Sequence, residues 1–235
     1  MKKTLLFLAL AATAGGLQAL AHDAWVDALG GPVYKVFYGH KAPEAYQATK
    51  ITSIKVLDAA QKSLKFTQAP VPGGMTLTPA SQPALFALEF DNGYWVKVGD
   101  EKESRNVRKS ALPAGTVGGQ SSHPLKFSKT MLRWAPWMSK ALGQRIEFVP
   151  VGLTAMPQAG SQLKLRLLLD GKPLANQMVE NNSNEAGPKT DAKGEVTVTV
   201  LKGINRYATD HDIMQANMPD AQRLSLTAAL VFAAK

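Results

Sequence analysis

Four histidines are the side chains of this sequence best suited to bind a transition metal. They are His22, His40, His123 and His211, and the chain of 235 residues contains no cysteine. Without thiolates, a metal site must be built from imidazole, carboxylate and a terminal amine, and imidazole suits zinc, copper, iron and nickel. The lack of cysteine also excludes disulfides and cysteine nucleophiles, so packing alone must stabilise the fold.

The segment before His22 has the pattern of a secretory signal peptide. Lys2 and Lys3 precede an apolar run over residues 5–12, and residues 19–21 (ALA) fit the small-x-small cleavage rule. We therefore expect a signal peptide over residues 1–21, export to the periplasm and a mature protein that begins at His22. The apolar run is too short to span a bilayer, so stable membrane insertion is not expected.

A histidine at a free amino terminus carries two ligand groups on one residue. Since an α-amino group titrates near pH ~8, a metal can displace its proton at neutral pH. The amine and Nδ1 of His22 can close a chelate ring, and a second imidazole would complete three nitrogens suited to copper(II) or nickel(II). We expect His40, just after the strand-like run VYKVFY, to supply that imidazole. The alternatives remain open: a frayed terminus at His22 and an ordinary turn residue at His40.

The third predicted metal ligand is His211, which lies between two aspartates. Flanking carboxylates can orient an imidazole that binds a metal, although the same residues would also suit a solvated polar loop. The candidates for supporting residues or additional ligands are Asp23, His123, Asp210 and Asp212.

Motifs of enzyme active sites do not occur in the sequence. It has no Gly-x-Ser-x-Gly elbow, no His-Glu-x-x-His and no phosphate-binding glycine loop. The formal charge of +9 is spread along the chain rather than gathered in a basic helix. That pattern disfavours nucleic-acid binding and is more typical of attraction to an anionic surface. We therefore expect a binding protein and not an enzyme.

Strand-like patterns dominate the rest of the chain. Residues 33–38 and 51–57 read as strands, residues 161–169 alternate apolar and charged side chains, and turns rich in Gly, Asp and Pro separate such runs. Asp91-Asn92-Gly93 predicts a hairpin turn between strands at 84–90 and 93–98. The sequence predicts a mostly β protein with two immunoglobulin-like β-sandwich units, over residues 22–150 and 151–235. A short helical or aromatic segment is expected within residues 129–142.

Several motifs together resemble a known family. They are AHDAW at residues 21–25, Gly39-His40, and KTMLRW at residues 129–134. In this order they resemble periplasmic proteins of unknown function that are commonly labelled the periplasmic component of an ABC-type cobalt or nickel transport system. The run from Leu163 to Val200 is similar to carboxypeptidase-regulatory-like sandwich modules. The resemblance implies a metal-handling periplasmic protein made of two β-sandwich units.

The function expected from residues and resemblance together is binding of a divalent transition metal as an accessory to metal uptake. Nickel or cobalt is the expected ion, with copper as a further option, and a metal permease of the ABC or ECF type is the expected partner. Two alternatives remain: an N-terminal-histidine copper oxidoreductase, and a structural or adhesion-like sandwich without metal. Tight metal binding would exclude the last, and reductant-dependent oxygen consumption by the copper form would indicate the oxidoreductase.

Overall fold

The computed structural model describes residues 22–40, 42–182, 186–215 and 217–235. The predicted signal peptide lies outside these residues. The described chain consists of strands and three short 3₁₀ turns, η1 (Ala48–Lys50), η2 (Lys109–Ala111) and η3 (Pro136–Ser139), which confirms the mostly β class. No helix among the described residues has the length and apolar character needed to cross a membrane.

The first sheet, here called the N-terminal sheet, has the order β1-β2-β5-β4. Its strands are β1 (Asp23–Gly30), β2 (Val33–Gly39), β4 (Phe66–Val71) and β5 (Gly74–Pro79). β1 and β2 pair antiparallel from Gly30 opposite Val33 to Asp23 opposite Gly39. The open end of this hairpin therefore brings residue 22 and residue 40 together.

The second and largest sheet, the central sheet, has the order β13-β12-β15-β16-β8-β6-β3, with β7 also paired to β8. Its strands are β3 (Ile51–Leu57), β6 (Leu85–Asp91), β7 (Trp95–Val98), β8 (Gly118–Met131), β12 (Met178–Glu180), β13 (Ala186–Lys189), β15 (Gly203–Met214) and β16 (Arg223–Ala234). β8 and β16 run parallel, side by side. This pairing joins strands from both sides of the predicted boundary at residue 150 into one sheet.

The third sheet, the C-terminal sheet, is formed by β9 (Ile146–Pro150), β10 (Gln162–Leu169), β11 (Lys172–Pro173) and β14 (Glu195–Thr199). β10 follows the predicted alternation, since Leu163, Leu165 and Leu167 are almost fully buried. Its hairpin to β11 turns at Asp170 and Gly171, both with positive φ, the backbone geometry that an Asp-Gly hairpin turn requires.

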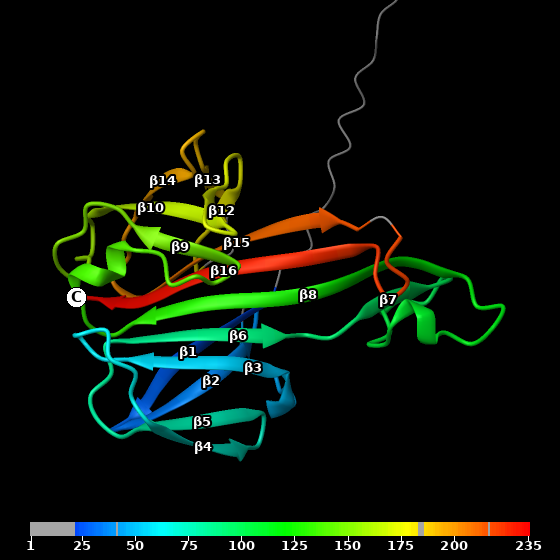
Figure 1. The fold of residues 1–235 in the computed structure, drawn as a ribbon, viewed down its shortest axis with the longest axis horizontal. Helices are drawn as coiled ribbons and strands as arrows, with labels where there is room; N and C mark the ends of the chain where they lie inside the picture. The colour runs from blue at the N-terminus through cyan, green and yellow to red at the C-terminus, as the bar shows by residue number, and fades with distance from the viewer. Residues whose placement is uncertain (1–21, 41, 183–185, 216) are drawn as a thin grey trace, which may run out of the picture.

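The central sheet lies between the other two sheets, so the molecule has three layers (Figure 1). β6 shows how one strand serves both interfaces, because its side chains alternate between the faces. Leu85 and Ala87 belong to the core shared with the C-terminal sheet, whereas Phe86, Leu88 and Phe90 belong to the core shared with the N-terminal sheet. Each such buried aromatic or leucine contributes about 1.5–3 kcal/mol relative to exposure.

One expectation for a single segment needs correction. The hairpin at Asp91-Asn92-Gly93 is wrong: β6 and β7 do not pair with each other but follow one another along β8, with Asp91 opposite Leu125 and Trp95 opposite Ser122. The side chain of Asn92 is buried and donates to the Tyr38 hydroxyl, which holds the chain in its course. In the expected helical segment, residues 129–131 end strand β8 and only Pro136–Ser139 form a 3₁₀ turn.

Candidate functional site

His22 and His40 lie together at the open end of the β1–β2 hairpin. Asp23 opposite Gly39 is the last paired position, and each histidine stands one residue beyond it. The centroids of the two imidazole rings are 6.1 Å apart. The structure thus brings together the two histidines that the sequence nominated as the centre of a metal site.

Glu44 adds a carboxylate to this pair. Nε2 of His22 lies 2.8 Å from Oε1 of Glu44. Since an ionised carboxylate has no proton to give, Nε2–H must donate this hydrogen bond. A neutral imidazole then has its lone pair on Nδ1, the nitrogen that can close a chelate ring with the residue's own α-amine.

An aromatic stack supports the His22 ring. The ring lies nearly parallel to that of Tyr38, with centroids 5.3 Å apart, and Tyr38 stacks in turn on Phe90 at 5.1 Å. Burial raises the pKa of Tyr38 to about 12, so its hydroxyl keeps its proton at neutral pH. The imidazole of His22 therefore has a rigid neighbour on one face while Glu44 contacts its edge.

The loop that carries His40 is closed by backbone contacts. The amide of Glu44 donates to the carbonyl of Tyr38 at 2.7 Å, and Gly39 forms a bridge with Pro43. Gly39 has φ +147°, and a Cβ there would lie 2.1 Å from the carbonyl oxygen of Ala42. Only glycine fits this close approach, which places Glu44 beside His22.

Arg206, on β15, contacts the same end of the hairpin from the central sheet. Its Nε lies 3.2 Å from Oδ2 of Asp23, and Nη2 donates to the carbonyl of His40 at 2.7 Å. The guanidinium also lies over the ring of Trp25, 4.4 Å from its centroid. One side chain thus links both strands of the hairpin to the central sheet.

A row of polar side chains on the central sheet continues beneath β1. Asp210, Thr227 and Lys126 face one another across β15, β16 and β8. Thr227 donates to Asp210 and accepts from Lys126. Burial raises the pKa of Asp210 and lowers that of Lys126. Burial also raises the pKa of Asp23 to about 6, against the lowering effect of Arg206 and Lys126.

The other nominated residues lie in different surroundings. Nδ1 of His211 lies 3.3 Å from Oε1 of Gln177, and Asp212 forms an ion pair with Arg223 at 3.1 Å. Asp210 points to Thr227 and Lys126, as described above. His123 contacts Asp91 at 2.8 Å and stacks on Tyr94. These contacts give His211, Asp212 and His123 local partners other than His22 and His40.

The donor set at the hairpin end fits a metal only if the α-amine takes part. Among the residues that the structure describes, no group of three His, Asp or Glu side chains is arranged to hold a metal ion. Because metal–nitrogen bonds are about 2.0–2.1 Å, two imidazoles on one ion have ring centroids up to roughly 6 Å apart. The 6.1 Å between His22 and His40 is at that limit, so both rings could reach one ion placed between them.

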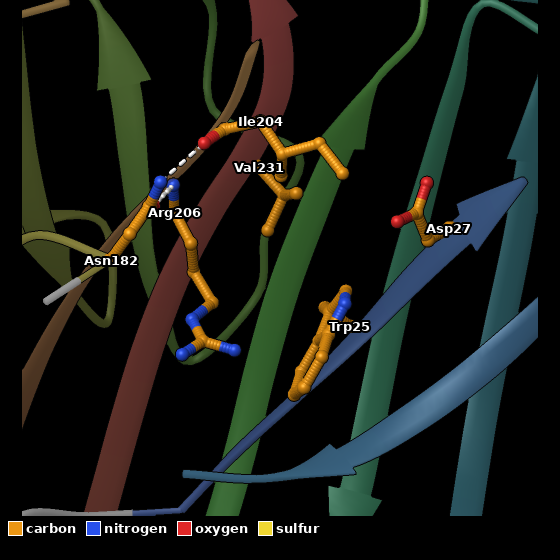
Figure 2. Close-up of a pocket in the computed structure, with 6 residues that line it drawn as sticks. All are labelled: Trp25, Asp27, Asn182, Ile204, Arg206 and Val231. Carbon is orange, nitrogen blue, oxygen red and sulfur yellow. Dashed lines mark hydrogen bonds between the residues drawn. The ribbon is translucent and has the colours of Figure 1, made fainter. Parts of the chain in front are cut away.

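A cavity adjoins this site on the side of Arg206. It has a volume of about 210 Å³ and is lined by Trp25, Asp27, Asn182, Ile204, Arg206 and Val231. Figure 2 shows the indole of Trp25 next to the guanidinium of Arg206, with Val231 beside the two and Asp27 farther along β1. Asn182 is tied to the backbone of Ile204 and Arg206 by its amide group.

Three residues of this site were not found from the sequence. Glu44 and Tyr38 lie within four residues of His40 in the sequence. Their closeness to this predicted ligand could have identified them as residues of the site. Arg206 stands 166 positions after His40, and nothing in its local sequence distinguishes it from other arginines. Its place becomes visible only in the folded chain, where Arg206 of β15 reaches Asp23 at the start of β1.

The chain is similar to known proteins both in sequence and in structure. A Haemophilus influenzae protein described as uncharacterized is 28% identical over 227 residues, covering 96% of each chain. Among solved structures, the D0-D1 domain of intimin aligns over 91% of this chain and 97% of its own at 14% identity, with a TM-score of 0.22. Residues 19–206, which include His22, His40 and Arg206, match a family described as a domain of unknown function, DUF4198. The chain belongs to that family.

Proposed function

We propose that the processed protein binds a divalent transition metal at its amino terminus. The ligands are the α-amine and Nδ1 of His22 together with the imidazole of His40. The observation that carries the proposal is the meeting of these two histidines at the open end of the β1–β2 hairpin, with ring centroids 6.1 Å apart. Three nitrogen donors of this kind favour nickel(II), cobalt(II) or copper(II) over magnesium or calcium, which prefer oxygen.

Glu44 supports this assignment. Imidazoles that bind metals commonly donate their second ring N–H to a carboxylate, which fixes the tautomer and raises the basicity of the ligand nitrogen. The contact of His22 Nε2 with Glu44 has this form. It leaves Nδ1, the nitrogen that the chelate needs.

The cellular role we propose is that of a periplasmic accessory to metal uptake. The signal-peptide pattern of residues 1–21 supports export, and the resemblance to proteins labelled as nickel or cobalt transport components supports the role. The partner in this proposal is a metal permease. His22 and Glu44 are 40% and 50% exposed, so a partner could approach the bound ion directly.

Histidine substitutions test the proposal. The protein starting at His22, with its terminus verified by mass spectrometry, is titrated with nickel(II), cobalt(II) and copper(II). His22→Gln and His40→Gln should each weaken binding by more than the roughly 10–100-fold that follows loss of a supporting residue. His123→Gln is the matched control, because His123 contacts Asp91 and Tyr94, and it should keep wild-type affinity. Unchanged affinity in His22→Gln would refute the proposed site.

A further inference from the structure

The pairing of β1 and β2 does not extend to the two proposed ligand residues. Asp23 opposite Gly39 is the final paired position in the register. His22, just before Asp23, and His40, just after Gly39, each lie one residue beyond this pair, where hairpin ends ordinarily fray. The stack on Tyr38 and the closure of the loop at Glu44 hold the two residues from within the hairpin. Fixing the hairpin end relative to the rest of the fold takes contacts from outside the hairpin.

Arg206 provides such contacts to both strands. Through Asp23 it holds the residue next to His22, and through the carbonyl of His40 it holds the second ligand residue itself. The Arg206 side chain is 11% exposed and that of Asp23 is 4% exposed. In such surroundings an ion pair is little weakened by solvent, and loss of one partner leaves a buried charge unpaired.

These contacts hold the guanidinium beside a cavity. The cavity of about 210 Å³ is lined in part by Arg206 and Trp25. Figure 2 shows these two side chains. The guanidinium makes three different contacts at once: an ion pair, a hydrogen bond to a carbonyl, and a cation–π contact with an indole. A lysine ammonium could keep the charge near Asp23 but could not make all three contacts at once, because it lacks the forked donors of the guanidinium.

We infer that Arg206 is the positioning residue of the amino-terminal metal site. It holds His40 and the start of β1 at the separation that one metal ion can bridge. This inference rests on the proposed function. It adds that metal affinity depends on β15, a strand of the central sheet that supplies no ligand in the proposal.

The test compares Arg206→Lys and Arg206→Gln with the wild-type protein starting at His22. The matched control is Arg223→Gln, which removes another arginine of the central sheet, one paired with Asp212. Copper(II) affinity, the copper(II) electron paramagnetic resonance spectrum at saturation, and the thermal unfolding midpoint are measured for each protein.

We expect both Arg206 variants to bind copper(II) roughly 10–100-fold more weakly than wild type. Their saturated spectra should differ from the wild-type spectrum, because His40 no longer lies where the ion needs it. Arg223→Gln should keep both affinity and spectrum. Arg206→Lys retains the charge beside Asp23, so it serves as the folded test case if Arg206→Gln unfolds.

Two results would overturn the inference, and they are distinguishable. If wild type binds copper(II) through its amine while folded Arg206→Lys binds equally tightly with the same spectrum, Arg206 has a structural role only and the proposed function stands. If wild type binds no metal, or binds equally well with its amine blocked, the proposed function fails and the inference fails with it.

Discussion

At the scale of single residues, the contact between Glu44 and His22 gives the two nitrogens of one imidazole different roles. Glu44 accepts the hydrogen bond of Nε2–H, and this leaves the lone pair of Nδ1 for a metal. The exposed fractions of the two side chains, 40% and 50%, show that the contact is open to solvent. The contact should therefore matter more for metal binding than for stability, because contacts between polar or charged side chains that solvent reaches stabilise proteins little.

Replacing Glu44 tests whether its contact with His22 supports metal binding. Glu44→Ala should weaken nickel(II) or copper(II) binding by roughly 10–100-fold, since the tautomer and ring orientation of His22 are no longer fixed. Isothermal titration at pH 7 measures the change, and Glu103→Ala, an exposed glutamate of the loop after β7, is the control. Equal affinities in the two variants would contradict the role of Glu44.

Gly39 is the second residue whose replacement should matter. Gly39→Ala places a Cβ 2.1 Å from the Ala42 carbonyl, so the loop that carries His40 must move. We expect a loss of stability of more than about 1 kcal/mol together with weaker metal binding. Urea unfolding and metal titration measure the two effects. Gly31→Ala is the control, because Gly31 also has positive φ but no heavy atom lies near its Cβ position, and it should leave metal binding unchanged.

At the scale of elements, the segment between β6 and β7 marks where sequence reasoning fails. Asp-Asn-Gly is a strong hairpin signal, yet here Asp91 accepts from the amide of Gly93 and from His123, while Asn92 is buried against Tyr38. Tertiary contacts thus override a local turn preference. By contrast, β3 spans the predicted residues 51–57 and β10 has the predicted alternation, because burial of one face follows directly from the period of the sequence.

The contact between Asp91 and His123 makes a testable contribution to acid stability. The pKa of Asp91 lies below its usual value, and the largest cause is the hydrogen bond from His123. A carboxyl with a depressed folded pKa stabilises the fold above its unfolded pKa, and this stabilisation is lost as the pH falls through the folded pKa. Asp91→Asn should therefore be less stable than wild type at pH 7, with the difference shrinking toward pH ~3.

Urea unfolding of wild type and Asp91→Asn between those pH values measures this trend. Asp100→Asn, at an exposed turn after β7, should follow wild type throughout. A difference that stays constant across the whole pH range would show that the Asp91 carboxyl does not titrate as described.

At the scale of the whole molecule, the central sheet connects the N-terminal sheet and the C-terminal sheet. Its two faces carry separate cores, and parallel pairing of β8 with β16 joins residues that are about a hundred positions apart. The mostly β class and the pair His22–His40 were predictable, because strand patterns and the cleavage pattern are local signals. The shared sheet, the length of β8 and the role of Arg206 were not, because all three depend on which distant strands become neighbours.

A buried ion pair also joins two layers. Lys129 of β8 contacts Glu147 of β9, and burial lowers the pKa of Lys129. The Lys129 ammonium also donates to the carbonyl of Phe148, and Glu147 accepts from the amides of Leu142 and Gly143. Breaking one side of such a pair leaves an unpaired buried charge, which costs about 3–5 kcal/mol.

Glu147→Leu should accordingly destabilise the protein by about 3–5 kcal/mol, and the double variant Lys129→Met with Glu147→Leu should regain the part of this loss that comes from the unpaired Lys129 ammonium. The amides of Leu142 and Gly143 lose their carboxylate acceptor in both variants. Urea unfolding of the two single variants and the double variant gives the coupling between the residues. Strictly additive losses would mean that the pair does not act as a unit.

The central claim is that the α-amine of His22 is a metal ligand. The most direct test is a titration of nickel(II), cobalt(II) and copper(II) into residues 22–235, compared with the same protein carrying one extra alanine before His22. The extension keeps both imidazoles and Glu44 but turns the amine into an amide. We expect tight binding by the native terminus and weak binding by the extended one. Equal affinities in the two proteins would contradict the claim.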